Sequence, residues 1–145
     1  DSVHYYNSKE LFIEANEILI DQLTLFKDEL PKLSSDEENI FSLDINENTY
    51  HLIVEGFDDT IGNIIQSHIS LYVIDDDSIP SLCGYKKTHP LENTIEFYFT
   101  FNPNNKISKS DNQKKLNALI QTFQETCENL IIIYSNIKKE AVLNL

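Results

Sequence analysis

The sequence predicts an α+β fold with a single antiparallel sheet of four to five strands in a meander. An N-terminal helix and a long C-terminal helix should flank the sheet and pack on one of its faces. Apolar residues recur every three or four positions at both ends of the chain and alternate with polar residues in the middle. Short connections between successive strands favour antiparallel pairing, and one apolar face per strand favours helices on one side only. Residues 1–145 are expected to form one domain.

The first helix is predicted over residues 8–30. Asn7 and Glu10 have the spacing of a capping box, in which each side chain accepts a hydrogen bond from the other's backbone. Pro31 should end the helix because proline lacks a backbone N–H. The apolar face expected to pack on the sheet is marked by Leu11, Ala15, Ile18, Gln22 and Phe26, and it is widened by Phe12, Leu19 and Leu23.

The middle of the chain predicts the strands. Polar and apolar residues alternate in "IFSLDI" and "TYHLIVE", and the turn "NEN" between them indicates a hairpin. "SHISLYVI" is interpreted as a third strand, with Ile69, Leu71 and Val73 facing the core. "SLCGYKK" and "TIEFYFTF" complete the sheet, although Gly84 weakens the first of these two strands. The residues expected in the core include Leu71, Phe97, Phe99, Phe123 and Leu130.

A long C-terminal helix is predicted over residues 111–138, after a second capping-box pattern at Ser110 and Gln113. Its apolar seam has alternating spacings of four and three residues, and consists of Leu116, Ile120, Phe123, Cys127, Leu130, Tyr134 and Ile137. This seam fits packing on the sheet. Ile132 and Ile133 lie off the seam, which leaves open a homodimer formed through this helix.

The charge is unevenly distributed. The net charge is −13, with −15 between residues 10 and 77 and +2 between residues 78 and 145. Such a chain is a poor ligand for nucleic acids or anionic membranes, and it contains no arginine. The longest apolar run, at residues 130–133, is too short for a transmembrane helix. There is no secretory signal pattern, and only two cysteines, so a cytoplasmic location is expected.

No cofactor, metal or catalytic motif is predicted. An EF-hand that began at Asp75 would have Pro80 and Lys86 at the positions that require glycine and glutamate. The closest pair of zinc ligands, Cys83 and His89, is too widely spaced for an ordinary zinc site, and the histidines are expected on the surface. Glycine-rich phosphate loops and nucleophile motifs are missing, so we expect no enzymatic activity.

The acidic half of the chain predicts a surface for a protein with a basic face. Three aspartates follow the apolar stretch "ISLYVI", and two more precede it. Strand ends should gather these carboxylates beside aromatic anchors, which is typical of a tight interface. The predicted partner-binding residues are Glu55, Phe57, Asp58, Asp59, Tyr72, Asp75, Asp76 and Asp77. The function predicted from this surface is that of a bacterial immunity protein, which neutralises a toxin domain such as a basic nuclease by direct binding.

The chain also resembles the type III secretion chaperones. The resemblance lies in the strand "TIEFYFTFNP", the helix "KKLNALIQTFQETCENLIIIY" and the early "IFSLDI" and "YHLIVEG" hairpin. It covers about half of the chain, and it implies an acidic homodimer that binds a segment of an effector. It also implies a further helix in the middle of the chain, whereas residues 75–93 contain two prolines and turn residues.

Overall fold

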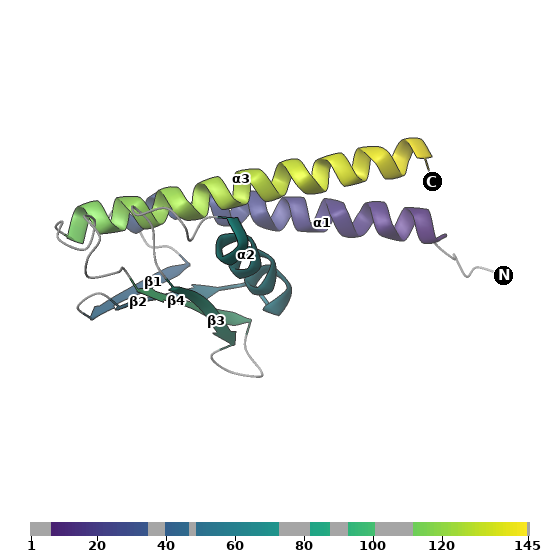
Figure 1. The fold of residues 1–145 in the computed structure, drawn as a ribbon. Coiled ribbons are helices and arrows are strands. Elements are labelled where there is room, and N and C mark those ends of the chain that lie inside the picture. Colours follow the sequence, from purple (N-terminus) through teal and green to yellow (C-terminus); the bar gives the residue numbers. More distant parts are fainter. Residues whose placement is uncertain are drawn as a thin grey trace.

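The computed structural model describes residues 7–34, 40–46, 49–72, 82–87, 93–100 and 112–144. It has an α+β fold, as predicted, with one antiparallel sheet and helices on one side of it (Figure 1). In chain order, the elements are α1 (Ser8–Glu29), the 3-10 helix η1 (Leu30–Ser34), β1 (Phe41–Asn46), β2 (Thr49–Glu55), α2 (Asp59–Tyr72), β3 (Leu82–Lys87), β4 (Thr94–Thr100) and α3 (Asn112–Asn144).

The strand order in the sheet is β1-β2-β4-β3, which differs from a simple meander. The predicted β1–β2 hairpin is confirmed, and β3 and β4 also pair with each other. However, β4 returns to pair with β2, so β3 becomes an edge strand. The register places Tyr50 opposite Phe99 and Leu52 opposite Phe97, so the apolar faces of these strands coincide.

The prediction of a third strand in "SHISLYVI" was wrong, because residues 59–72 form the helix α2. Ile61, Ile65 and Ile69 are spaced by four residues and are all buried, which is the pattern of one helix face. Leu71 falls on the opposite face and is 72% exposed, so it is not a core residue. The predicted Val73 lies outside the described residues.

Local signals set the ends of α1. The Asn7 side chain accepts a hydrogen bond from the Glu10 backbone N–H at 2.8 Å, so the predicted N-cap is present. The helix ends at Glu29, and the chain continues as η1, which contains Pro31. At the other end of the chain, α3 extends six residues beyond the predicted end at residue 138 and reaches Asn144. The predicted cap at Ser110 lies outside the described residues.

Aromatic rings join the helices to the sheet. The Phe26 ring of α1 lies 5.2 Å from that of Phe41, 5.4 Å from that of Phe57 and 6.1 Å from that of Phe97. The Phe97 ring also lies 5.2 Å from that of Phe123 in α3. Four of the five predicted core residues are buried, namely Phe97, Phe99, Phe123 and Leu130. The edge-to-face contacts of the Phe26 and Phe97 rings favour particular ring orientations, in addition to the stabilisation that comes from hydrophobic burial.

Helices α1 and α3 lie side by side and run antiparallel (Figure 1). Two ion pairs between the helices agree with this antiparallel direction. Lys27 Nζ lies 3.3 Å from Glu128 Oε1, and Lys138 Nζ lies 3.1 Å from Glu17 Oε1. The start of α1 and the end of α3 project past the sheet and past α2 as a two-helix arm, which we call the arm. Surface ion pairs of this kind contribute little stability, so the arm must be held mainly by its apolar contacts.

One buried hydroxyl in α3 leads to a stability prediction. Thr126 is fully buried, and within the described part of the chain its Oγ1 has no hydrogen-bond partner. Thr126→Val removes this unpaired polar group at almost constant volume, so we expect the free energy of unfolding to rise by about 1 kcal/mol. Thr122 is the matched control, because its Oγ1 donates to the Ala118 carbonyl at 2.8 Å. Urea denaturation should show no gain for Thr122→Val, and an equal gain for both variants would contradict the prediction.

Candidate protein-binding surface

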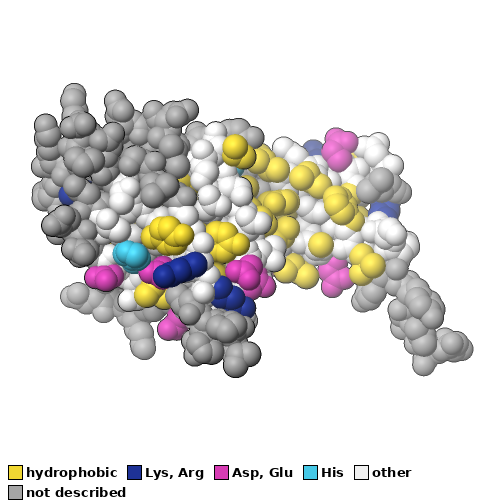
Figure 2. Space-filling model, turned by 60° about the horizontal axis from the view of Figure 1, so that its bottom comes forward, with side chains coloured by type: hydrophobic (Ala, Val, Ile, Leu, Met, Phe, Trp, Pro, Cys, Tyr) yellow, Lys and Arg dark blue, Asp and Glu magenta, His cyan; other side chains and the backbone are white. Residues whose placement is uncertain are grey.

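Hydrophobic side chains are exposed along the helices, and they gather over the arm (Figure 2). A soluble chain exposes scattered apolar side chains, but a collection on one part of the molecule marks a candidate interface. Among the residues that the structure describes, the large apolar side chains that are more than a third exposed are Leu11, Phe12, Ile18, Leu25, Leu71, Ile132, Ile133, Ile137, Val142 and Leu143. All of them are on α1, α2 or α3, so the helical layer carries the candidate surface.

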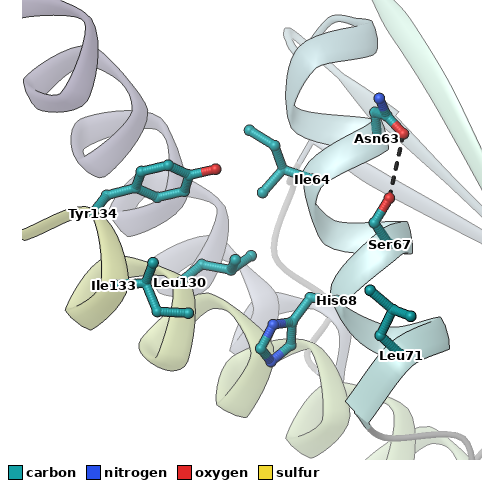
Figure 3. A pocket seen from close by; sticks show the side chains of 8 residues that line it. All are labelled: Asn63, Ile64, Ser67, His68, Leu71, Leu130, Ile133 and Tyr134. Carbon is teal, nitrogen blue, oxygen red and sulfur yellow. Dashed lines mark hydrogen bonds between the residues drawn. The ribbon is translucent and has the colours of Figure 1, made fainter. Parts of the chain in front are cut away.

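A hollow of about 320 Å³ lies between α2 and α3. Figure 3 shows Ile64 and His68 of α2 facing Leu130, Ile133 and Tyr134 of α3 across this space. A second hollow, of about 380 Å³, shares His68 and Ile133 and extends to Ile132. The two hollows are therefore parts of one shallow, mainly apolar depression beside α3.

Two titratable side chains line this depression. Burial lowers the pKa of His68, because the charged imidazolium loses hydration there. Burial also raises the pKa of the Tyr134 hydroxyl, because the charged phenolate would lose hydration. Both shifts favour the neutral form, so the depression suits an apolar side chain better than a charged ligand.

A third hollow, of about 400 Å³, lies near the end of the arm. Phe12 of α1 forms one wall, and Ile137 and Ala141 of α3 form another. Asn136, Glu140 and Asn144 supply its polar rim. The helical layer thus has a second place where an apolar side chain of another protein could be inserted.

Helix α1 carries an exposed apolar row, and two of its members, Leu11 and Ile18, were predicted to pack on the sheet. Leu11, Ile18 and Leu25 are 52%, 50% and 52% exposed, so the prediction that Leu11 and Ile18 pack on the sheet was wrong. The buried face of α1 instead contains Asn16, Leu23 and Phe26. The three exposed residues are seven positions apart, and this spacing was the signal in the sequence that could have revealed a second apolar face. We call Leu11, Ile18 and Leu25 the α1 row.

The structure places part of the predicted acidic surface. Glu55 is exposed at the end of β2, and Asp58 and Asp59 are exposed at the start of α2. The Asp58 side chain accepts a hydrogen bond from the Thr60 backbone N–H at 3.1 Å, so it helps to cap the helix. Asp75, Asp76 and Asp77 lie outside the described residues, so their part of the prediction stays a prediction.

Two features of the predicted surface need correction. Phe57 is only 2% exposed and packs on Phe26, so it cannot act as an aromatic anchor for a partner. Tyr72 ends α2, whereas Asp59 begins it, and a 14-residue helix spans about 20 Å. The helix therefore keeps Tyr72 apart from Asp58 and Asp59, although these residues were expected to lie together at the ends of neighbouring strands. The side chain of Tyr72 is outside what the structure describes.

The histidines also differ from the prediction. His68 was expected on the surface, but it lies on α2 and is only 8% exposed. His51 is on the outer face of the sheet, where its Nδ1 lies 2.6 Å from Glu96 Oε1. Lys86 Nζ lies 3.5 Å from the other oxygen of Glu96, so these side chains link β2, β4 and β3. No group of three potential ligands that could hold a metal ion occurs among the described residues.

The sequence matches no protein-family model and shows no significant similarity to any curated protein. Within the described segments, none of the helices combines the length and apolar character needed to cross a membrane. The candidate surface therefore has to be interpreted from its own geometry and chemistry.

Proposed function

We propose that this protein is a non-enzymatic protein-binding module. The observation that carries the proposal is the exposed apolar surface of the helical layer, where half-exposed side chains adjoin hollows large enough for side chains of a partner. A partner that covers exposed apolar side chains removes their surface from water. This lowers the free energy and favours association. The lack of a catalytic motif in the sequence supports a binding role rather than an enzymatic one.

The geometry best supports a chaperone-like module that holds a segment of another protein, as the type III secretion chaperones do. That resemblance implies a helix in the middle of the chain, and α2 lies between the two hairpins. An apolar surface with separate hollows also suits an apolar segment whose side chains enter them one by one. A homodimer through α3 belongs to this proposal, and the exposed Ile132 and Ile133 support it.

The second candidate is an immunity protein that blocks a toxin domain, such as that of a basic nuclease. The exposed carboxylates of Glu55, Asp58 and Asp59 and the net charge of −13 favour it. A strongly acidic protein associates rapidly with a basic cleft, because opposite charges steer the encounter. Both candidates act on proteins of the cytoplasm, and a cytoplasmic location is part of the proposal.

Co-expression with the product of the adjacent gene tests the binding role. A stable complex in size-exclusion chromatography with light scattering is the expected result. Rescue of cell growth would identify a toxin as the partner, whereas improved solubility of a secreted effector would identify a chaperone. If the product is neither bound, neutralised nor kept soluble, the adjacent gene does not encode the partner and the proposal loses its support.

For the complex so obtained, replacing Asp75, Asp76 and Asp77 by asparagine should slow association and flatten its dependence on salt. We predict that these carboxylates are solvated in the free protein, so folding should be almost unchanged, because exposed charges contribute little to stability. Stopped-flow kinetics at low and high ionic strength provide the measurement. Equal association rates for the parent and the variant at every ionic strength would remove these aspartates from the interface.

A further inference from the structure

We propose that the α1 row binds an amphipathic helix of a partner protein, and that this helix carries lysine or arginine beside its apolar face. The proposal rests on the proposed binding function and specifies the chemistry of the partner. It is drawn from the repeat in α1, where the exposed apolar residues and their acidic neighbours recur together.

The spacing of the α1 row indicates that its occupant is helical. Leu11, Ile18 and Leu25 recur every seven residues, so along the helix they are separated by about 10 Å. Ala15 is exposed and Gln22 is half-buried, and these smaller or flexible side chains fill the positions between them. Apolar side chains at this interval form the ridge into which a second helix inserts its own seven-residue repeat. An extended strand, with side chains on one face about 7 Å apart, would not keep this register.

Acidic side chains border the α1 row on one side. Each member of the row is followed three positions later by an exposed carboxylate, and these are Glu14, Asp21 and Asp28. Residues three positions apart are neighbours on a helix surface, so the border runs alongside the whole row. Among the described residues, no lysine or histidine forms an ion pair with any of these three carboxylates.

This border argues for a basic partner and against a second copy of the chain. In a symmetric antiparallel pair of α1 helices, Ile18 would meet Ile18 of the other copy, and the two acidic borders would face each other. Like charges that face each other at the edge of a helical interface are repulsive, whereas lysine or arginine at these places is attractive. The net charge of −13 adds to the repulsion between copies.

A pair of synthetic peptides tests the proposal. One probe is an amphipathic helix about three heptads long, with leucine at the two apolar positions of each heptad and lysine at the flanking positions. The matched probe has glutamate in place of lysine. We expect the lysine peptide to bind at least about tenfold more tightly than the glutamate peptide, measured by fluorescence anisotropy at low salt. Circular dichroism should show that the lysine peptide gains helicity when it binds.

Variants of the protein assign the binding to the row and its border. The double variant Leu11→Gln with Ile18→Gln should weaken binding of the lysine peptide by about tenfold or more. Ile53→Gln is the matched control, because Ile53 is half-buried on the outer face of the sheet, away from the helices, and the affinity of this variant should equal that of the parent. The triple variant Glu14→Gln, Asp21→Asn and Asp28→Asn should flatten the salt dependence. Unchanged thermal unfolding would show that the variants are folded.

Three results would overturn the proposal. They are binding of neither peptide, equal binding of the two peptides, and a parent dimer in light scattering that the Leu11→Gln and Ile18→Gln changes convert to a monomer. The last result would identify a second copy as the occupant. Each leaves the proposed function open to its own test, because co-expression with the adjacent gene product does not depend on this row.

Discussion

Replacing Phe97 by alanine should lower the free energy of unfolding by about 3–5 kcal/mol, which is the usual cost of truncating a buried phenylalanine. Phe97 is fully buried at the centre of the inner face of the sheet. Its ring lies 6.1 Å from that of Phe26 in α1 and 5.2 Å from that of Phe123 in α3. Both helices and two strands therefore border the cavity that the truncation would leave, and such a site cannot collapse easily.

Leu71→Ala is the matched control for this experiment. Leu71 and Phe97 were both expected in the core, but Leu71 is 72% exposed on α2. Its truncation should change the free energy of unfolding by less than about 0.5 kcal/mol, as is usual for surface positions. Urea denaturation of the two variants separates these values clearly. A loss of less than about 1 kcal/mol for Phe97→Ala, or a large loss for Leu71→Ala, would contradict the arrangement of the core.

At alkaline pH, the buried thiol of Cys127 should lower the free energy of unfolding. The thiol is fully buried in α3, and burial raises the pKa of Cys127 from 9.0 to about 12, with smaller opposing effects of Lys27 and Glu128. Between these two pH values the unfolded chain releases the thiol proton and the folded chain keeps it. Fewer protons are then bound in the unfolded state, so stability falls as the pH rises above about 9.

Comparison with Cys127→Ala isolates this effect, because the other titrating groups are common to both proteins. The variant should be less stable at neutral pH, since it loses buried apolar contacts. The difference in the free energy of unfolding between the parent and this variant should decrease by about 1.5 kcal/mol between about pH 9 and about pH 10.5. Urea denaturation under reducing conditions measures the difference. If the two stability curves stay parallel over this range, the thiol is not held in its neutral form.

The sequence predicted the elements whose signals are local. The alternation in β4 and the hairpin of β1 and β2 were recognised, because the turn residues and one-sided burial are encoded within a few positions. The seam of α3 was also recognised, and its members Phe123, Cys127 and Leu130 are buried. These predictions succeeded because the same local pattern decides both the backbone conformation and the buried face.

The interpretation of α2 failed because one stretch satisfied two patterns. Ile69, Leu71 and Val73 alternate as in a strand, whereas Ile61, Ile65 and Ile69 have helical spacing. Burial against β3 and α3 selects the helix, and Gly62 permits a close approach to the sheet. A Cβ at Gly62 would lie 2.8 Å from the Tyr85 ring. Contacts between distant parts of the chain made this choice, and no local signal reports them.

The candidate site shows the same division between sequence and tertiary structure. The sequence alone determined the acidic character, the amphipathic helices and the seven-residue spacing of Leu11, Ile18 and Leu25. It could not decide which apolar face of α1 is buried, because α1 has apolar residues over more than half of its circumference. Leu23 and Phe26 pack on α3 and the sheet, so their face of α1 is buried and the α1 row remains exposed. A helix can bury only the side that its neighbours reach, so the tertiary structure decided which side remains for a partner.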